Sequence, residues 1–134
     1  MNRKKVLVVD DDRVVLAALT LKLNANGYDV VTAADGAAAV TAVRKEKPDL
    51  ILLDINFPAD PGSALQDGMG ILTWLKRLDE LARIPIVVIT SGDRTRYEDK
   101  ARAAGAAAFF QKGGDHEKLV AIIRTALDEN PASA

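Results

Sequence analysis

The sequence predicts one doubly wound α/β domain built on a parallel five-stranded sheet, and three observations support this prediction. Short apolar runs of strand length recur five times, each followed by a segment with helical spacing of apolar residues. Three of these runs are continuously apolar and rich in valine, isoleucine and leucine, which is typical of parallel strands covered on both faces. The length of 134 residues suits a single domain that buries its own core.

The expected strands cover residues 6–9, 30–33, 50–53, 86–89 and 107–110. Each expected helix carries apolar residues spaced three or four positions apart. In chain order these residues are Val15, Leu19 and Leu23; Val40 and Val43; Ile71, Leu75 and Leu78; Tyr97, Ala101 and Ala104; and Leu119, Ile122, Ile123, Ala126 and Leu127. The first and fourth helices are expected to stop at Gly27 and Gly105 and the second before Pro48, while Asp115 is a candidate N-cap of the fifth.

The domain is expected to cover residues 1–129, followed by a flexible tail at 130–134. One irregular stretch, 56–67, is long for a connection between a strand and a helix. Whether the chain is a complete single-domain protein or a fragment of a longer one stays open from the sequence.

Composition argues against several classes of function. The 18 basic and 19 acidic residues give a formal net charge of −1, so no overall positive field attracts nucleic acid or an anionic membrane. The absence of cysteine excludes disulfides, thiol catalysis and cysteine-ligated zinc. Neither an export signal nor an apolar stretch near the ~20 residues of a membrane span is visible. We therefore expect a cytoplasmic protein that binds neither nucleic acid nor membrane directly.

Polar residues follow four of the expected strands at their carboxyl ends, where ligands of open parallel sheets bind. They are Asp10, Asp11 and Asp12 after the first strand, Asp54 after the third, Thr90 and Ser91 after the fourth and Lys112 after the fifth. Crowded carboxylates repel one another unless a hard divalent cation lies among them, and Mg²⁺ is the natural candidate. A carboxylate can also act as a nucleophile toward phosphorus, with Lys112 and the metal neutralising charge and a hydroxyl of Thr90 or Ser91 donating to a phosphoryl oxygen.

The segments VLVVDDD, LILLDIN, VVITSG and AGAAAFFQKG resemble, in order and spacing, the signatures of the response-regulator receiver family of two-component signalling. The resemblance covers nearly the whole chain. It implies a flavodoxin-like (βα)5 domain similar to single-domain chemotaxis regulators, with three layers and strand order 2-1-3-4-5. It also implies a phosphorelay signalling domain, not an enzyme, which receives its phosphoryl group from a histidine kinase or phosphotransfer protein and assists its own phosphorylation and dephosphorylation.

The resemblance carries over to a metal site and a phosphoacceptor. Asp54 matches the acceptor and belongs to the Mg²⁺ site. Asp11 matches the direct metal ligand, Asp10 a ligand acting through water, and Asn56 the ligand that binds through its backbone carbonyl.

The resemblance also implies a switch that reads the phosphorylated state. Thr90 and Lys112 match the family's switch hydroxyl and phosphate-binding lysine, and Phe109 matches its switch aromatic. The expected output is a change of protein contacts on the surface of the fourth helix, fifth strand and fifth helix. A homodimer, the cognate kinase and the downstream partner are left open.

Two departures from the family pattern stand beside the site. Gly113 follows Lys112 where the family usually has a proline with a cis peptide bond. The loop after the third strand is longer than the family's short turn, with Pro58 and Asp67 near its two ends and an insertion within residues 59–66.

Alternative interpretations remain for the same residues. A flavin-binding electron carrier of this fold should have phosphate-cradling Ser, Thr and Gly after the first strand, and a Mg²⁺-dependent phosphatase should have an Asp-x-Asp pair there, which Asp10 and Asp12 would supply. The acidic run could also be an ordinary start of a helix, and Phe109 an ordinary core aromatic. His116, the single histidine, is expected to be a solvated residue without a chemical role.

Overall fold

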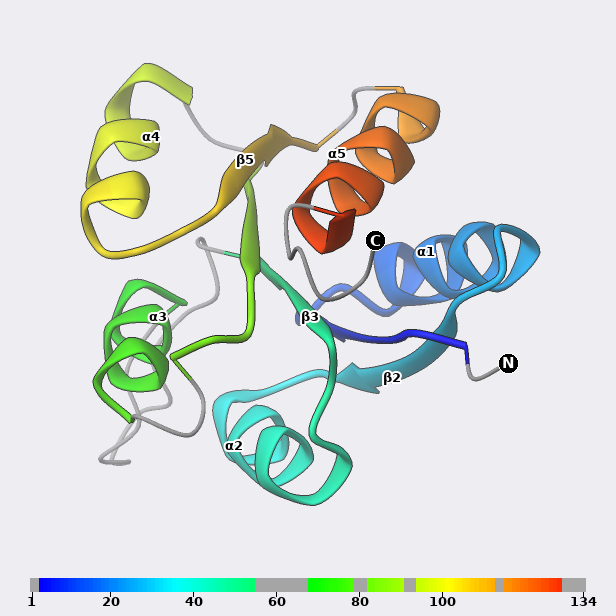
Figure 1. Cartoon of the computed structure of the whole chain (residues 1–134), viewed down its shortest axis with the longest axis horizontal. Helices are drawn as coiled ribbons and strands as arrows, with labels where there is room; N and C mark the ends of the chain where they lie inside the picture. The colour runs from blue at the N-terminus through cyan, green and yellow to red at the C-terminus, as the bar shows by residue number, and fades with distance from the viewer. Residues whose placement is uncertain (1–2, 55–67, 79–81, 91–93, 113–114, 129–134) are drawn as a thin grey trace.

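The structure is a computed structural model that describes residues 3–54, 68–78, 82–90, 94–112 and 115–128. Strands and helices alternate along these residues (Figure 1). The strands are β1 (Lys5–Val9), β2 (Asp29–Ala33), β3 (Leu50–Asp54), β4 (Ile86–Thr90) and β5 (Ala108–Gln111). The helices are α1 (Arg13–Ala25), α2 (Gly36–Glu46), α3 (Gly68–Arg77), α4 (Arg94–Ala103) and α5 (His116–Asp128). The predicted strands and helices are confirmed, and each strand begins within one residue of its expected start.

The five strands form one parallel sheet in the order β2-β1-β3-β4-β5, as the family resemblance implied. In this sheet Val8 of β1 lies between Thr32 of β2 and Leu52 of β3. Every residue of β3 and β4 is buried, because helices cover both faces. The chain first adds β2 on one side of β1 and then adds β3, β4 and β5 on the other. The topological switch point therefore lies between β1 and β3, where such folds bind their ligands.

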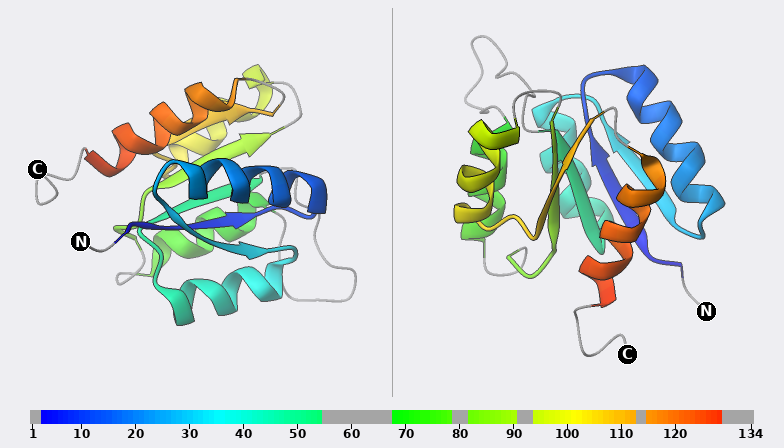
Figure 2. Two further views of the ribbon diagram at one scale, coloured as in Figure 1. Left: turned by 90° about the vertical axis from the view of Figure 1, so that its right-hand side faces the viewer. Right: turned by 90° about the horizontal axis from the view of Figure 1, so that it is seen from above.

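Two helices cover one face of the sheet and three cover the other. Figures 1 and 2 show α1 beside α5 on one face, with α2, α3 and α4 on the opposite face. Successive residues of each strand point to alternate faces. Leu7 and Val9 therefore belong to the core under α2, α3 and α4, whereas Val6 and Val8 belong to the core under α1 and α5.

Short polar side chains and backbone turns define the helix ends. Asp12 caps α1 by accepting from the backbone N–H groups of Val14 and Val15, and Asp35 caps α2 by accepting from Ala38. Asp115 accepts from the Glu117 N–H at 2.8 Å, which confirms it as the cap of α5. Helix α2 ends at Glu46, two residues before Pro48, as predicted, because a proline disfavours helical backbone at the residue that precedes it.

The buried stripes of α1 and α2 differ in part from those that the spacing predicted. In α1 the buried residues are Leu16, Leu19 and Leu23, while Val15 is only partly buried at the flank of the helix. In α2 Ala39 is buried in place of Val40. Apolar spacing locates the face of a helix to within one residue, but the packing angle against the sheet decides which neighbour is covered. No helix among the described residues combines the length and apolar composition that a membrane crossing requires.

The two glycines that were expected to end α1 and α4 both have positive φ, and we predict that they tolerate alanine unequally. Gly27 has φ +92° with open space around it, so Gly27→Ala should lower the free energy of unfolding by about 1 kcal/mol through backbone strain alone. Gly105 has φ +110°, and an added Cβ would lie 3.0 Å from Lys76 Cγ. The Lys76 ammonium donates to the carbonyls of Ala82 and Ile84, so the methylene groups of Lys76 cannot move freely away from a Cβ added at Gly105.

Gly105→Ala should therefore destabilise the protein more than Gly27→Ala in urea unfolding with an unchanged slope. Equal midpoints for the two variants would contradict this account.

Candidate functional site

The carboxyl ends of β1, β3, β4 and β5 bring their polar residues to one edge of the sheet. Asp10 directly follows β1, Asp54 and Thr90 are the last residues of β3 and β4, and Lys112 directly follows β5. Asp10, Asp54 and Thr90 are buried, with exposed fractions of 0%, 2% and 0%. The predicted convergence of these residues is therefore confirmed.

Three carboxylates form an acidic cluster at this edge. One oxygen from each of Asp10, Asp11 and Asp54 lies within 4.8 Å of the other two. Asp11 is exposed, whereas the other two carboxylates are almost completely withdrawn from water. Negative charges this close raise the free energy of the folded state unless a cation lies among them.

Lys112 supplies a cation from the protein itself. Its ammonium lies 2.7 Å from Asp10 Oδ2 and 3.2 Å from Asp54 Oδ2, so one side chain contacts both buried carboxylates. The backbone N–H of Lys112 donates to the Thr90 carbonyl at 2.7 Å, which anchors the lysine to the end of β4. Burial by itself would lower the pKa of Lys112, but the Asp10 and Asp54 carboxylates together outweigh it, and the net pKa is raised.

The donor set fits a hard divalent cation. All three side chains offer carboxylate oxygens, the ligands that Mg²⁺ and Ca²⁺ prefer. Asp10 Oδ1 accepts from the Asp12 N–H at 2.9 Å, whereas Asp10 Oδ2 is buried and its close contact is the ion pair with the Lys112 ammonium at 2.7 Å. A buried carboxylate oxygen of this kind has a lone pair available for a metal or for metal-bound water.

Asp12 differs from its two acidic neighbours. Its carboxylate accepts from Val14 N at 2.9 Å and from Val15 N at 3.4 Å, so it serves the start of α1 and lies outside the acidic cluster. The interpretation of the acidic run as an ordinary helix start is therefore correct for Asp12 alone. The single run of three aspartates serves two separate purposes.

The two neighbouring phenylalanines of β5 point to opposite faces of the sheet. Phe109 pairs in register with Val88, is 4% exposed and packs in the core that also contains Ala101 of α4. Phe110 is partly buried against the core of α1 and α5. The expected alternation is confirmed, and the ring assigned to the switch is already buried.

Several predicted site features lie outside the described residues. They are Asn56, Pro58, the insertion at 59–66, Ser91, Gly113, the tail at 130–134 and the side chain of Tyr97. His116 is half-buried and lines a pocket between α1 and α5, so its expected solvated position is only partly correct. Sequence reasoning also missed the contact of Lys112 with Asp10, since the distance between two strand ends leaves no local signal in the sequence.

A five-stranded parallel sheet in this order, with an acidic cluster and a lysine at the carboxyl edge, defines a domain of the receiver type. The profile of the response regulator receiver domain matches residues 6–124. The chain therefore belongs to the response regulator receiver domain family of two-component signalling.

Known relatives agree with this assignment. Transcriptional regulatory protein PrrA of Mycobacterium tuberculosis is 35% identical over 132 residues, which cover 97% of this chain and 52% of PrrA. Polar-differentiation response regulator DivK of Brucella anthropi is 28% identical, with 94% of this chain and 98% of DivK covered. The crystal structure of a CheY-like response regulator receiver domain protein from Methanospirillum hungatei superposes with a TM-score of 0.85 at 25% identity, covering 99% of this chain and 100% of that one.

This chain thus spans about half the length of PrrA and nearly the whole length of DivK. What is common to these relatives is the receiver, which is a signalling domain and not a classical enzyme. Family membership favours this interpretation over the flavin carrier and the aspartate-nucleophile phosphatase.

The raised pKa of Lys112 predicts a specific dependence of stability on pH. A group whose pKa is raised by folding stabilises the folded state fully below its unfolded pKa, about 10.4 for lysine, and the stabilisation disappears as the pH rises through the folded value. In metal-free buffer, the free energy of unfolding of the original protein, measured with urea, should decline between pH 8 and 11. Lys112→Met should lack this decline. Lys45→Met, on the exposed side of α2, serves as the control and should keep it. Identical curves for the two variants would refute the ion-pair account.

Proposed function

We propose that Asp54 is the residue that accepts a phosphoryl group from a histidine kinase or histidine phosphotransfer protein in a Mg²⁺-dependent reaction. The observation that carries this proposal is the position of its carboxylate at the end of β3, where it is 2% exposed, belongs to the acidic cluster and lies 3.2 Å from the Lys112 ammonium. Phosphoryl transfer requires mainly positioning and charge neutralisation from the protein, and this arrangement offers both.

In the proposed reaction an Asp54 carboxylate oxygen forms a bond to phosphorus while the donor's phosphorus–nitrogen bond breaks and its electron pair stays on the imidazole. Lys112 neutralises negative charge on the phosphoryl oxygens. Asp10, Asp11, Asp54 and the Asn56 carbonyl would hold Mg²⁺, which when bound supplies the remaining charge neutralisation. The buried position of Asp10 Oδ2 and the all-oxygen donor set support this assignment.

Removing the Asp54 nucleophile should abolish labelling. Acetyl phosphate with Mg²⁺ should add one phosphoryl group to the protein, located at Asp54 by mass mapping, and Asp54→Asn should reduce this labelling to background, because an amide is a far poorer nucleophile than a carboxylate. Asp12→Asn removes a neighbouring carboxylate but keeps a good N-cap, so it is the matched control and should remain labelled. Labelling of Asp54→Asn at the original level would eliminate the assignment.

Two neighbouring aspartates, Asp11 and Asp12, should differ in function, the first as a metal ligand and the second as the N-cap of α1. Asp11→Asn should weaken Mg²⁺ binding by about tenfold or more, whereas Asp12→Asn, which removes the same charge from the next position, should change it much less. Conversely, Asp12→Ala should lower the free energy of unfolding by about 1 kcal/mol through loss of the α1 cap. A titration of each variant with Mg²⁺ measures the ranking, and equal losses at the two positions would reject it.

The output is proposed to be a change of protein contacts on the α4, β5 and α5 surface, through which a downstream partner or a second copy binds. Phe109 supports this choice because it lies on β5, the middle element of that surface, and packs in the core that also contains Ala101 of α4. Since Phe109 is only 4% exposed, an inward rotation would bury little more of the ring in this conformation. The coupling would therefore act through the Thr90 hydroxyl and the packing around Phe109.

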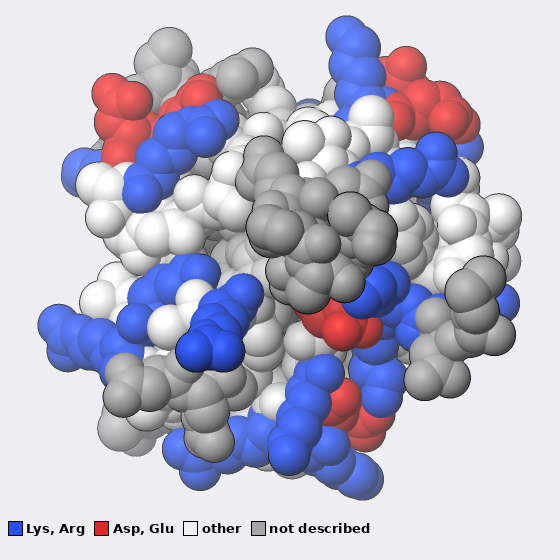
Figure 3. Space-filling view, in the orientation of Figure 1, with Lys and Arg blue, Asp and Glu red and all other residues white. Residues whose placement is uncertain are grey.

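A cytoplasmic setting without direct contacts to nucleic acid or membrane completes the proposal. The net charge is −1, and on the face drawn in Figure 3 acidic side chains lie beside basic ones at the top and lower right, whereas the described residues at the lower left show basic side chains. A chain with this balance of charge has no overall positive field of the kind that attracts phosphate backbones or anionic lipids. Protein partners, the kinase and the reader of the phosphorylated state, remain as the proposed contacts.

Loss of the Thr90 hydroxyl should uncouple output from phosphorylation. Thr90→Ala should leave labelling of Asp54 largely intact but reduce the NMR amide shifts that phosphorylation causes at residues 98–112 and 115–125. Thr90→Ser keeps the hydroxyl and should retain those shifts, which controls for the packing change at a residue with 0% exposure. If Thr90→Ala retains the full shifts, Thr90 is not the coupling group.

A further inference from the structure

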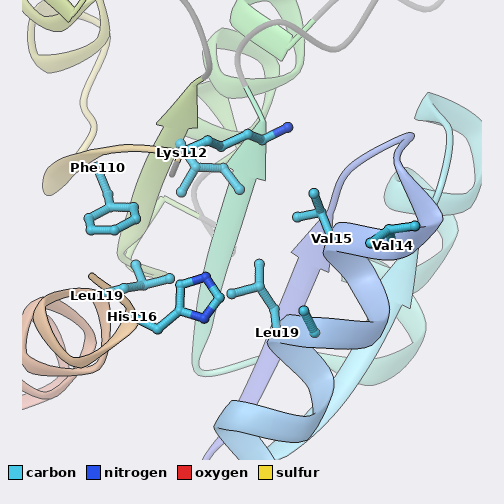
Figure 4. A pocket seen from close by; sticks show the side chains of 9 residues that line it. Val14, Val15, Leu19, Phe110, Lys112, His116 and Leu119 are labelled. Carbon is cyan, nitrogen blue, oxygen red and sulfur yellow. The ribbon is translucent and has the colours of Figure 1, made fainter. Parts of the chain in front are cut away.

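A pocket of about 140 Å³ lies between the first turns of α1 and α5, and Lys112, whose ammonium contacts the acidic cluster, is one of its lining residues. Figure 4 shows Val15 and Leu19 of α1 facing Phe110, His116 and Leu119 across this space. Apart from His116 and Lys112, the lining side chains are apolar. The proposed phosphorylation chemistry makes no use of this pocket.

The walls of the pocket are held in place independently of any occupant. Leu19 and Leu119 are 3% and 2% exposed and belong to the core. An ion pair joins Lys22 of α1 to Glu117 of α5, and Arg124 donates to Asn26 Oδ1 at 3.2 Å, so the two helices are also tied to each other. A cavity near 150 Å³ lined by aliphatic and aromatic groups accepts a benzene-sized molecule, so this pocket has the size of one six-membered ring.

The polar groups around the pocket determine which substituents a ring-shaped ligand can carry. The imidazole of His116 projects between Leu19 and Leu119 and can make one hydrogen bond to an occupant (Figure 4). The nearby charges disfavour a carboxylate, because Asp12 and Asp115 already cap the two helix starts and the Lys112 ammonium is engaged by Asp10 and Asp54. The pocket therefore matches an uncharged ring with a single hydroxyl or similar group.

Lys112 connects the pocket with the acidic cluster. The side chain lines the pocket, and Figure 4 shows its ammonium pointing away from the other lining residues. This ammonium contacts Asp10 and Asp54. An occupant that packs against the lysine holds it extended, with its positive charge between Asp10 and Asp54. A divalent cation must share the same oxygens, so it binds less favourably when that charge is fixed there.

We infer that the pocket between α1 and α5 binds a small uncharged phenol-like ligand and that its occupancy weakens cation binding at the acidic cluster through Lys112. The second half of this inference rests on the proposed cation site, whereas the first does not. By reciprocity, the cation weakens ligand binding by the same factor. The site thus couples an apolar small molecule to the metal on which phosphorylation is proposed to depend.

The ligand half is tested on the full chain in metal-free buffer with 4-fluorophenol as the probe, followed by ¹⁹F and amide NMR. Saturable binding with a Kd of about 1 mM is expected, with shifts at Leu19, Phe110 and Leu119. Fluorobenzene and 4-fluorobenzoate should bind more weakly. Val15→Phe should fill the pocket and weaken binding at least tenfold, while Leu21→Phe, at a position on α1 that is 74% exposed and outside the pocket, should not.

His116→Leu keeps the bulk of the side chain and should remove the preference for 4-fluorophenol over fluorobenzene. Absence of saturable binding, or equal binding to Val15→Phe and Leu21→Phe, overturns the inference. Shifts at the pocket that follow protein concentration without probe would overturn it too, because they assign the pocket to a second copy of the chain.

The coupling half is tested by titrating Mg²⁺ with and without saturating 4-fluorophenol. The apparent Kd for Mg²⁺ should rise about fivefold with the probe, and Val15→Phe should show no dependence on it. Probe binding with an unchanged Kd for Mg²⁺ overturns the coupling. Failure of Mg²⁺ to bind at all, with normal probe binding, would instead reject the proposed cation site.

Discussion

Asp10 and Asp54 stand at the carboxyl ends of adjacent strands with almost no exposure to water, and the ammonium of Lys112 contacts both. Two buried carboxylates at this spacing need a partner cation, because their desolvation and repulsion would otherwise oppose folding. The neutralising charge comes from Lys112, directly after β5, which is three strands away from β1 in the sheet. The ion pairs of Lys112 with Asp10 and Asp54 therefore form only when the whole sheet is assembled. They link the end of the outer strand β5 to the ends of the inner strands β1 and β3.

The apolar framework explains how the sheet tolerates so much charge. Residues of β3 and β4 are buried and covered on both faces, so the strands themselves hold Asp54 and Thr90 in place at their ends. The Lys112 backbone is anchored to the Thr90 carbonyl, so the lysine also starts from a fixed point. Charge is thus confined to the carboxyl edge of the sheet and does not enter the apolar core on either face.

Lys112 also gives the site two sides. The ammonium of Lys112 contacts the acidic cluster, and the side chain also lines the apolar pocket between α1 and α5. Phe109 and Phe110 repeat this division on β5, since one ring packs toward α4 and the other toward α1 and α5. A change at the acidic cluster can therefore affect both faces of the sheet through β5, whose side chains alternate between them.

The sequence by itself determined the class of fold and the inventory of polar residues at the site. Continuous apolar runs identify buried parallel strands, and the carboxyl ends of parallel strands share one edge, so the convergence of Asp10, Asp54, Thr90 and Lys112 follows from periodicity and topology. Only the tertiary structure decided how neighbouring residues divide their roles. It buried Leu16 in place of Val15 in α1, buried Ala39 in place of Val40 in α2, and brought Lys112 to Asp10. These outcomes depend on differences of a few ångströms in how helices pack against the sheet, and local sequence patterns do not encode distances between segments far apart in the chain.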